Sequence, residues 1–208
     1  ALDQIRLESQ FWYFKFFSFT SSLDKMLVSD SVSRTSFNRY VSAHGLNFKH
    51  PSGIEFGFSE VVIYGGVNRK LEAYYLTPIL PYYVKQLNQR TIDDNILWSL
   101  ALDLSFWKGK EFYAEFLIDD FQADSKGEPN QTGYLLGARW SNPFGIDRTF
   151  LNLEYTRLRF WLYGATVPWN RFFFHEVGLG STLGPDADLI RGSFLYHLRK
   201  DFSIQAKH

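Results

Sequence analysis

The stretch DNILWSLALDLSFW, residues 94–107, alternates between large apolar side chains and mostly smaller or polar ones. From Ile96 to Phe106 every second residue is large and apolar, and Ser99, Ala101 and Asp103 stand between them. Because successive side chains of a β-strand point to opposite sides of its sheet, this pattern predicts a strand whose two faces meet different surroundings. The apolar face would meet a protein core in a soluble sandwich and lipid in an outer-membrane barrel.

The composition of the chain fits a protein of the cell envelope. Its 208 residues are enough for one domain with its own core. The absence of cysteine excludes disulfides and thiolate metal sites. The 22 basic and 22 acidic residues balance, so no nucleic-acid partner is expected. Aromatic residues make up 19% of the chain, an excess that aromatic girdles at two membrane interfaces would absorb.

The hydropathy of the chain excludes a helical membrane span, because no run of about 18 apolar residues occurs. A mean hydropathy of −0.21 is still compatible with a barrel, since half of each spanning strand is polar. The first residues, ALDQIRLESQ, lack the basic and apolar regions of a signal peptide. We therefore expect a processed product or an excerpt of a longer chain.

Alternation along the whole chain predicts nine strands. Most of them reach the roughly 9–11 residues that cross a bilayer with tilt. They cover residues 11–20, 34–48, 53–64, 95–107, 111–121, 132–141, 149–163, 189–198 and 202–208.

The connections between these strands alternate in length. Short joins at 49–53, 108–110, 142–147 and 199–201 alternate with long ones at 21–33, 65–94, 122–131 and 164–188. In an up-and-down meander this order puts every tight turn at one end of the strands, as in outer-membrane barrels with short periplasmic turns and long external loops. Nine strands also indicate an excerpt, because single-chain bacterial barrels have even strand numbers.

The sequence therefore predicts an all-β fold, a transmembrane up-and-down antiparallel β-barrel. Residues 1–208 would form a single partial barrel domain of about nine strands, excerpted from a larger barrel. The segment 65–94 is expected to be a long external loop or a plug-like insertion.

Six stretches resemble, in this order, the capsule-assembly Wzi-like outer-membrane proteins. They are AHGLNF at 43–48, GIEFGFSEVVIYGG at 53–66, YYLTPILPYYVKQLN at 74–88, DDNILWSLALDLSF at 93–106, EFYAEFLIDDFQ at 111–122 and GLGSTLGPDADL at 178–189. The resemblance implies a monomeric barrel of about eighteen strands that binds surface polysaccharide as a lectin and helps to anchor the capsule. Two features depart from the family pattern: Gly45 stands where an Arg usually follows the histidine, and the chain holds about half of such a barrel.

The turn pattern would gather carboxylates and aromatic rings at the external rim of the barrel. Carboxylates accept hydrogen bonds from sugar hydroxyls, and an aromatic ring stacks on the apolar side of a pyranose. The candidate polysaccharide-binding residues are Glu60, Asp94, Asp120, Asp186, Asp188, Trp169, Tyr74 and Tyr75.

Two other interpretations of the rim acids stay open. An oxygen-rich rim also suits Ca²⁺, which would bridge the acids to an anionic polymer, so the metal content is unknown. The acids can equally be solvated or paired with Arg157, Arg159 and Arg171, and simply cap strands.

Catalysis and bound cofactors are not expected. A glycosidase needs two carboxyl groups about 5–10 Å apart around a sugar, whereas Asp119 and Asp120 are neighbours in a strand and point to opposite faces. A G-x-S-x-G motif is absent. The histidines at 44, 175 and 197 show no metal-ligand spacing.

Charged residues are also expected inside the barrel. Glu115 and Glu154 would point into the lumen, where pairing with Arg139 or Arg191 is the expected role.

Taken together, the sequence predicts an outer-membrane protein of a bacterial cell that binds surface polysaccharide and assists capsule or exopolysaccharide assembly and anchoring. Its partners would be outer-membrane lipid and surface polysaccharide, and it would be a monomer. The alternatives are an outer-membrane enzyme acting on lipid or glycan and a porin-like channel, which would require an open lumen.

Overall fold

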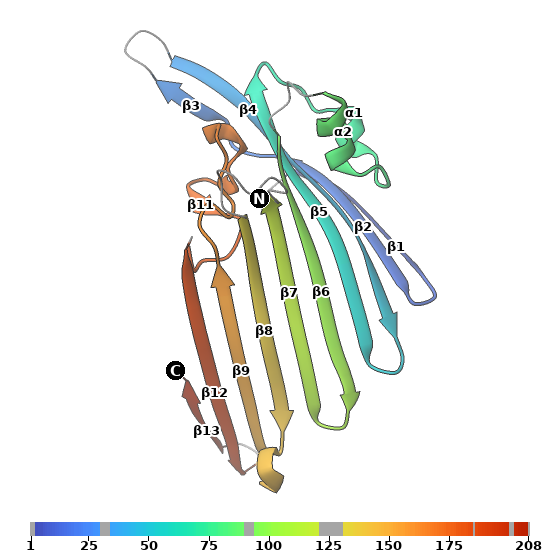
Figure 1. Cartoon of the computed structure of the whole chain (residues 1–208), viewed down its shortest axis with the longest axis vertical. Coiled ribbons are helices and arrows are strands. Elements are labelled where there is room, and N and C mark those ends of the chain that lie inside the picture. Colours follow the sequence, from blue (N-terminus) through green and yellow to red (C-terminus); the bar gives the residue numbers. More distant parts are fainter. Residues whose placement is uncertain are drawn as a thin grey trace, which may run out of the picture.

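The computed structural model describes residues 3–29, 34–89, 94–120, 131–184, 186–199 and 202–207. Within these residues, eleven antiparallel strands form one sheet (Figure 1). The strands are β1 (Gln4–Phe11), β2 (Phe14–Ser22), β3 (Met26–Ser29), β4 (Arg34–His50), β5 (Ile54–Val67), β6 (Asn95–Trp107), β7 (Lys110–Asp120), β8 (Gln131–Ser141), β9 (Thr149–Leu158), β12 (Ala187–Arg199) and β13 (Phe202–Lys207).

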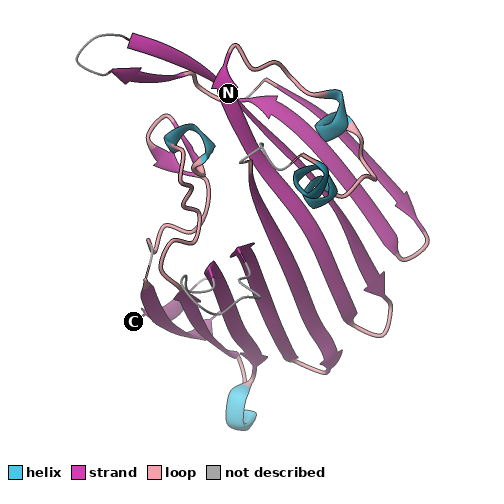
Figure 2. Cartoon of the chain, turned by 45° about the horizontal axis from the view of Figure 1, so that its top comes forward, coloured by secondary structure: helices cyan, strands magenta, loops and turns pink. Residues whose placement is uncertain are grey.

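The sheet is an up-and-down meander, as the sequence predicts. Its order is β1-β2-β4-β5-β6-β7-β8-β9-β12-β13, and β3 pairs with the part of β4 that extends beyond β2. The sheet curves strongly from β1 to β13 (Figure 2). Among the described residues it is not closed: β1 and β13 each pair with a single strand and form the two edges. The antiparallel β-fold is therefore confirmed, whereas a closed barrel is not seen.

The tight turns gather at one end of the sheet. They are the turns at residues 12–13, 51–53, 108–109 and 142–148, the last of which contains the short helix η1 (Pro143–Gly145). In Figure 1 they follow one edge of the sheet, which slopes from the right side down to the bottom. The strand ends that lead into the longer connections lie at the opposite end, which we call the long-loop end. Gly53 and Gly109 have φ values of +89° and +72°, a region that favours glycine, and both occupy such turns.

The N-terminal strands differ from the prediction. The predicted strand 11–20 begins too early, because the chain turns at Trp12 and Tyr13 and a further strand, β1, precedes that turn. Strand β3 was not predicted, since its four residues are too few for a periodicity. The predicted strand 149–163 ends at Leu158, where the chain leaves the sheet.

The two faces of the sheet differ in polarity. On β6 the side chains of Leu100, Leu102 and Leu104 define an apolar face, and those of Ala101 and Asp103 lie on the opposite, polar face. On strands β5 to β12, many large apolar side chains of the apolar face are 38% to 71% exposed; we call this area the apolar band. It includes Phe56, Phe58, Leu102, Phe112, Phe116, Leu136, Leu153, Ile190 and Phe194.

The packed core lies at the long-loop end, where each face is covered by a different segment. On the polar face, residues 159–184, which we call the crossing segment, bring Leu162 and Phe172 against Val41, Ile63 and Leu97. The crossing segment contains the short helix η2 (Pro168–Asn170) and the two-residue strands β10 (Phe173–Phe174) and β11 (Val177–Gly178).

On the apolar face, residues 71–89 form the helical segment, with helices α1 (Ala73–Leu76) and α2 (Tyr82–Asn88). Its Tyr75 and Tyr82 are fully buried against Val62, Tyr64 and Ile96. The helical segment, expected as an external loop or a plug, therefore packs on the apolar face of the sheet. No helix in the described part of the chain is long and apolar enough to cross a membrane.

Candidate functional site

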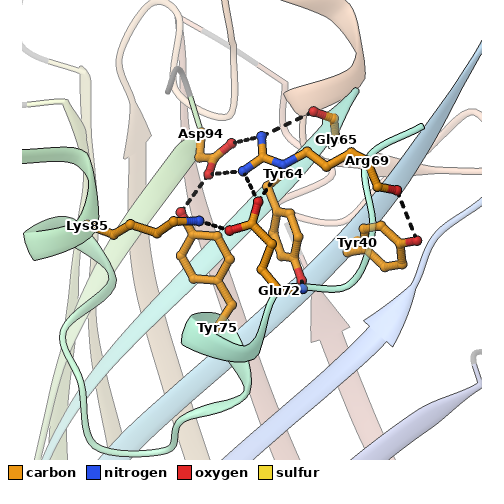
Figure 3. Close-up of polar contacts among 8 residues, drawn as sticks. All are labelled: Tyr40, Tyr64, Gly65, Arg69, Glu72, Tyr75, Lys85 and Asp94. Carbon is orange, nitrogen blue, oxygen red and sulfur yellow. Dashed lines mark hydrogen bonds and ion pairs between the residues drawn. The ribbon is translucent and has the colours of Figure 1, made fainter. Parts of the chain in front are cut away.

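A partly buried charge network holds the helical segment on the sheet (Figure 3). The guanidinium of Arg69 donates to both carboxylate oxygens of Asp94, at 2.6 and 2.8 Å, and the Tyr75 hydroxyl donates to Asp94 at 2.5 Å. Arg69 also pairs with Glu72, which pairs with the ammonium of Lys85. Burial and the nearby Asp94 raise the pKa of Tyr75, so its hydroxyl stays a donor.

Glu60, which is 2% exposed, fixes the start of α2. Its carboxylate accepts hydrogen bonds from the backbone N–H groups of Tyr82 at 2.7 Å and Tyr83 at 3.0 Å, and from the Trp98 indole at 2.8 Å. The Nε2 atom of His44 lies 3.2 Å from the same group. The backbone N–H groups at the start of α2 and the Trp98 indole compensate the buried carboxylate of Glu60 for the water that it loses.

Four of the eight predicted site residues therefore lie near one another, but their polar groups bind other groups of the protein. Glu60, Asp94 and Tyr75 are buried and internally paired, and the Tyr74 hydroxyl donates to the carbonyl of Pro81 at 2.8 Å. They do not form the exposed rim that the sequence predicts. The physical reason is strand parity, because Glu60 lies on the same face as Phe56 and Phe58, the face that the helical segment covers.

Asp186 and Asp188 lie elsewhere, at the start of β12. Both pair with Arg157, at 2.9 and 3.6 Å, and both are exposed. Asp188 stands opposite Arg157 in the register, next to the pair Ile190 and Tyr155 on the apolar face. The interpretation in which these acids pair with Arg157 is confirmed.

Trp169 lies on η2, on the polar side of the sheet. Its indole stacks on the ring of Phe37 at a centroid distance of 4.1 Å, and its carbonyl accepts from Arg39 at 2.7 Å. Arg39 is fully buried and also donates to the carbonyls of Arg171 and Phe173, so it ties the crossing segment to β4. Trp169 is therefore not an exposed stacking platform. The side chain of Asp120, the eighth predicted residue, lies outside the described residues.

The sequence did not single out a cavity of about 500 Å³ on the polar face, beneath the crossing segment. Its polar lining includes Glu115, Glu154, Thr156, Tyr163, Ser181, Thr182 and Arg191. Glu154 accepts from Arg191 at 3.3 Å, as expected, and from the Tyr113 hydroxyl at 3.0 Å. Glu115 is exposed, and its carboxylate has no hydrogen-bond or ion-pair partner within the described residues.

A second hollow, of about 390 Å³, continues the cavity toward the short turns, because both are lined by Glu115 and Leu135. Asp103, Tyr113 and Arg139 line it. Strand parity alone could have placed these side chains on one face. The crossing segment that covers part of the cavity follows no periodicity, and for this reason the sequence did not indicate this site.

No group of three or more histidine, aspartate or glutamate side chains in the described ranges is placed to hold a metal ion. No protein-family model, no curated protein and no solved structure matches the chain. The class of the protein therefore rests on its own architecture. It is an open, curved antiparallel meander with an exposed apolar band on one face. On the other face the cavity and the adjoining hollow form one polar depression, which we call the groove.

Proposed function

We propose that this sheet is part of the wall of an outer-membrane β-barrel and that it binds surface polysaccharide in the groove on its polar face. The observation that carries the proposal is the contrast between the two faces. Large apolar side chains stand exposed in the apolar band, and charged side chains line the opposite face of the same strands. A bilayer outside and water inside would satisfy both faces at once.

The aromatic residues support this arrangement. Pairs such as Phe14–Phe48, Trp107–Phe112 and Trp140–Phe144 lie beside the short turns, and Tyr134–Tyr155 and Tyr83–Trp98 lie at the other limit of the apolar band. Trp98 and Trp107 are nine residues apart, about 30 Å along a strand and about 23 Å across a membrane at a tilt near 40°, close to the roughly 25 Å band of known barrels.

The groove has the chemistry of a sugar site. The carboxylate of Glu115 can accept hydrogen bonds from sugar hydroxyls, and the hydroxyls of Thr156 and Thr182 can both donate and accept them. Arg191 offers a cation to acidic sugars. The resemblance of six stretches of the chain to Wzi-like proteins supports the same ligand class. Each contact is small, so strong retention would depend on many repeats of a polymer binding together.

The test uses cells that hold a surface polysaccharide and carry the full chain in wild-type or variant form. Glu115→Gln removes the free carboxylate, and Thr182→Trp fills the cavity from the crossing segment without changing a strand. Both variants are expected to lower polysaccharide retention several-fold when outer-membrane protein levels are matched.

The control is the double variant Asp186→Asn with Asp188→Asn, because both side chains pair with Arg157 and neither lines the cavity or the hollow. A loss of retention in this control alone would move the binding site to the external rim. Absence of the wild-type chain from the outer-membrane fraction would contradict the proposed location, and released sugar would favour the enzyme alternative.

A further inference from the structure

The helical segment carries apolar side chains on its outer surface as well as on its inner one. Ile79 is 81% and Leu87 61% exposed, and Leu76, Leu80, Tyr83 and Val84 are exposed too. A helical surface segment normally turns charged or polar side chains toward water. The two charged residues between Leu71 and Gln89 are Glu72 and Lys85, and these pair with each other.

This outer surface is held in place by its buried contacts. Tyr75 and Tyr82 fill the space against the sheet, Asp94 binds Arg69 and Tyr75, and Glu60 binds the start of α2. Since the inner positions are occupied, Ile79 and Leu87 cannot turn inward without breaking buried ion pairs and hydrogen bonds.

The exposed surface of the segment continues the apolar band. The segment packs on the apolar face, and the ring of Tyr83 meets that of Trp98 edge-to-face at 5.3 Å. Trp98 precedes Leu100, which pairs with Phe58 of the band. A protein partner that covered the segment alone would leave the adjoining band bare, whereas one lipid surface would cover both.

We propose that the helical segment docks on the lipid surface, with Ile79, Leu80 and Leu87 inserted at the headgroup level beside the barrel wall. This inference rests on the proposed outer-membrane location. It adds a second membrane contact, an interfacial one, to the spanning strands. Segments of this kind place their apolar side chains about 5–10 Å into the boundary between headgroups and acyl chains.

The test uses single cysteines, because the chain has none of its own. The full chain, reconstituted into phosphatidylethanolamine–phosphatidylglycerol vesicles, carries an environment-sensitive fluorophore at Ile79→Cys. The matched control is Val177→Cys, which is 68% exposed and lies in the crossing segment on the opposite face. We expect quenchers attached near the lipid headgroups to quench the label at position 79 at least about twofold more strongly than at position 177.

A third label, at Leu102→Cys in the apolar band, separates this inference from the proposed function. Quenching at position 102 without quenching at position 79 would overturn the inference and leave the barrel wall intact. Absence of quenching at both positions would overturn the membrane location itself. Quenching at position 79 by a deep, acyl-chain quencher alone would contradict the interfacial depth.

Discussion

At the scale of single residues, Asp94 connects the guanidinium of Arg69 to the Tyr75 hydroxyl of the helical segment. Asp94 is 3% exposed, and its two oxygens take two hydrogen bonds from Arg69 and one from Tyr75. Removing one partner of a buried ion pair costs far more than removing an exposed one, because the remaining charge stays desolvated.

Asp94→Asn should therefore weaken the docking of the helical segment by about 3 kcal/mol. Hydrogen exchange and proteolysis between residues 71 and 89 would measure this loss. Asp188→Asn, which removes an exposed pair with Arg157, should cost less than about 1 kcal/mol. Equal free-energy costs for the two substitutions would contradict the expectation that the buried pair of Asp94 stabilises the fold more than the exposed pair of Asp188.

Sequence-based prediction was least accurate for the exposure and the partners of individual site residues. Glu60 and Asp94 were expected to be exposed sugar ligands because they stand near strand ends. The sequence correctly placed them at the long-loop end of the sheet. Because Glu60 is four residues from Phe56 in the same strand, alternation already placed its side chain on the apolar face. Their partners could not be predicted, since Arg69 and α2 reach them through a segment without periodicity.

At the scale of strands, alternation of side chains predicted most of the sheet. The predicted range 95–107 matches β6, and 132–141 differs from β8 by one residue. The prediction failed where this signal is short or interrupted, as in β3 and around Trp12, whose φ of 50° belongs to a turn. Alternation also assigned the faces of β6 correctly, which makes a direct test of lipid exposure available.

Leu102→Arg places a charge in the middle of the apolar band, and Ala101→Arg places the same charge beside the hollow on the polar face. Folding titrations in lipid vesicles should show a cost of about 2–4 kcal/mol for Leu102→Arg and much less for Ala101→Arg. An equal cost at both positions would indicate that the apolar band faces protein instead of lipid.

At the scale of the whole molecule, the gathering of tight turns at one end defines an orientation. Lys108 follows the short-turn end of β6, and Lys70 follows the long-loop end of β5; both are exposed. Outer-membrane barrels keep their short turns in the periplasm and their long loops outside the cell.

Intact cells should therefore label Lys70→Cys with a membrane-impermeant thiol reagent and leave Lys108→Cys unlabelled. Permeabilised cells should label both positions, which checks that each cysteine is reactive. Labelling of Lys108→Cys alone on intact cells would reverse the orientation and put the helical segment on the periplasmic side.

The tie between Arg39 and the crossing segment is a long-range contact in a fold built mostly from chain neighbours. Consecutive strands of the sheet are mostly neighbours in the chain, so each hairpin can join the growing sheet at a small cost in loop-closure entropy. Arg39, however, binds the carbonyl of Trp169, 130 residues further along the chain. Closing this contact therefore costs more loop-closure entropy than pairing two strands that are neighbours in the chain.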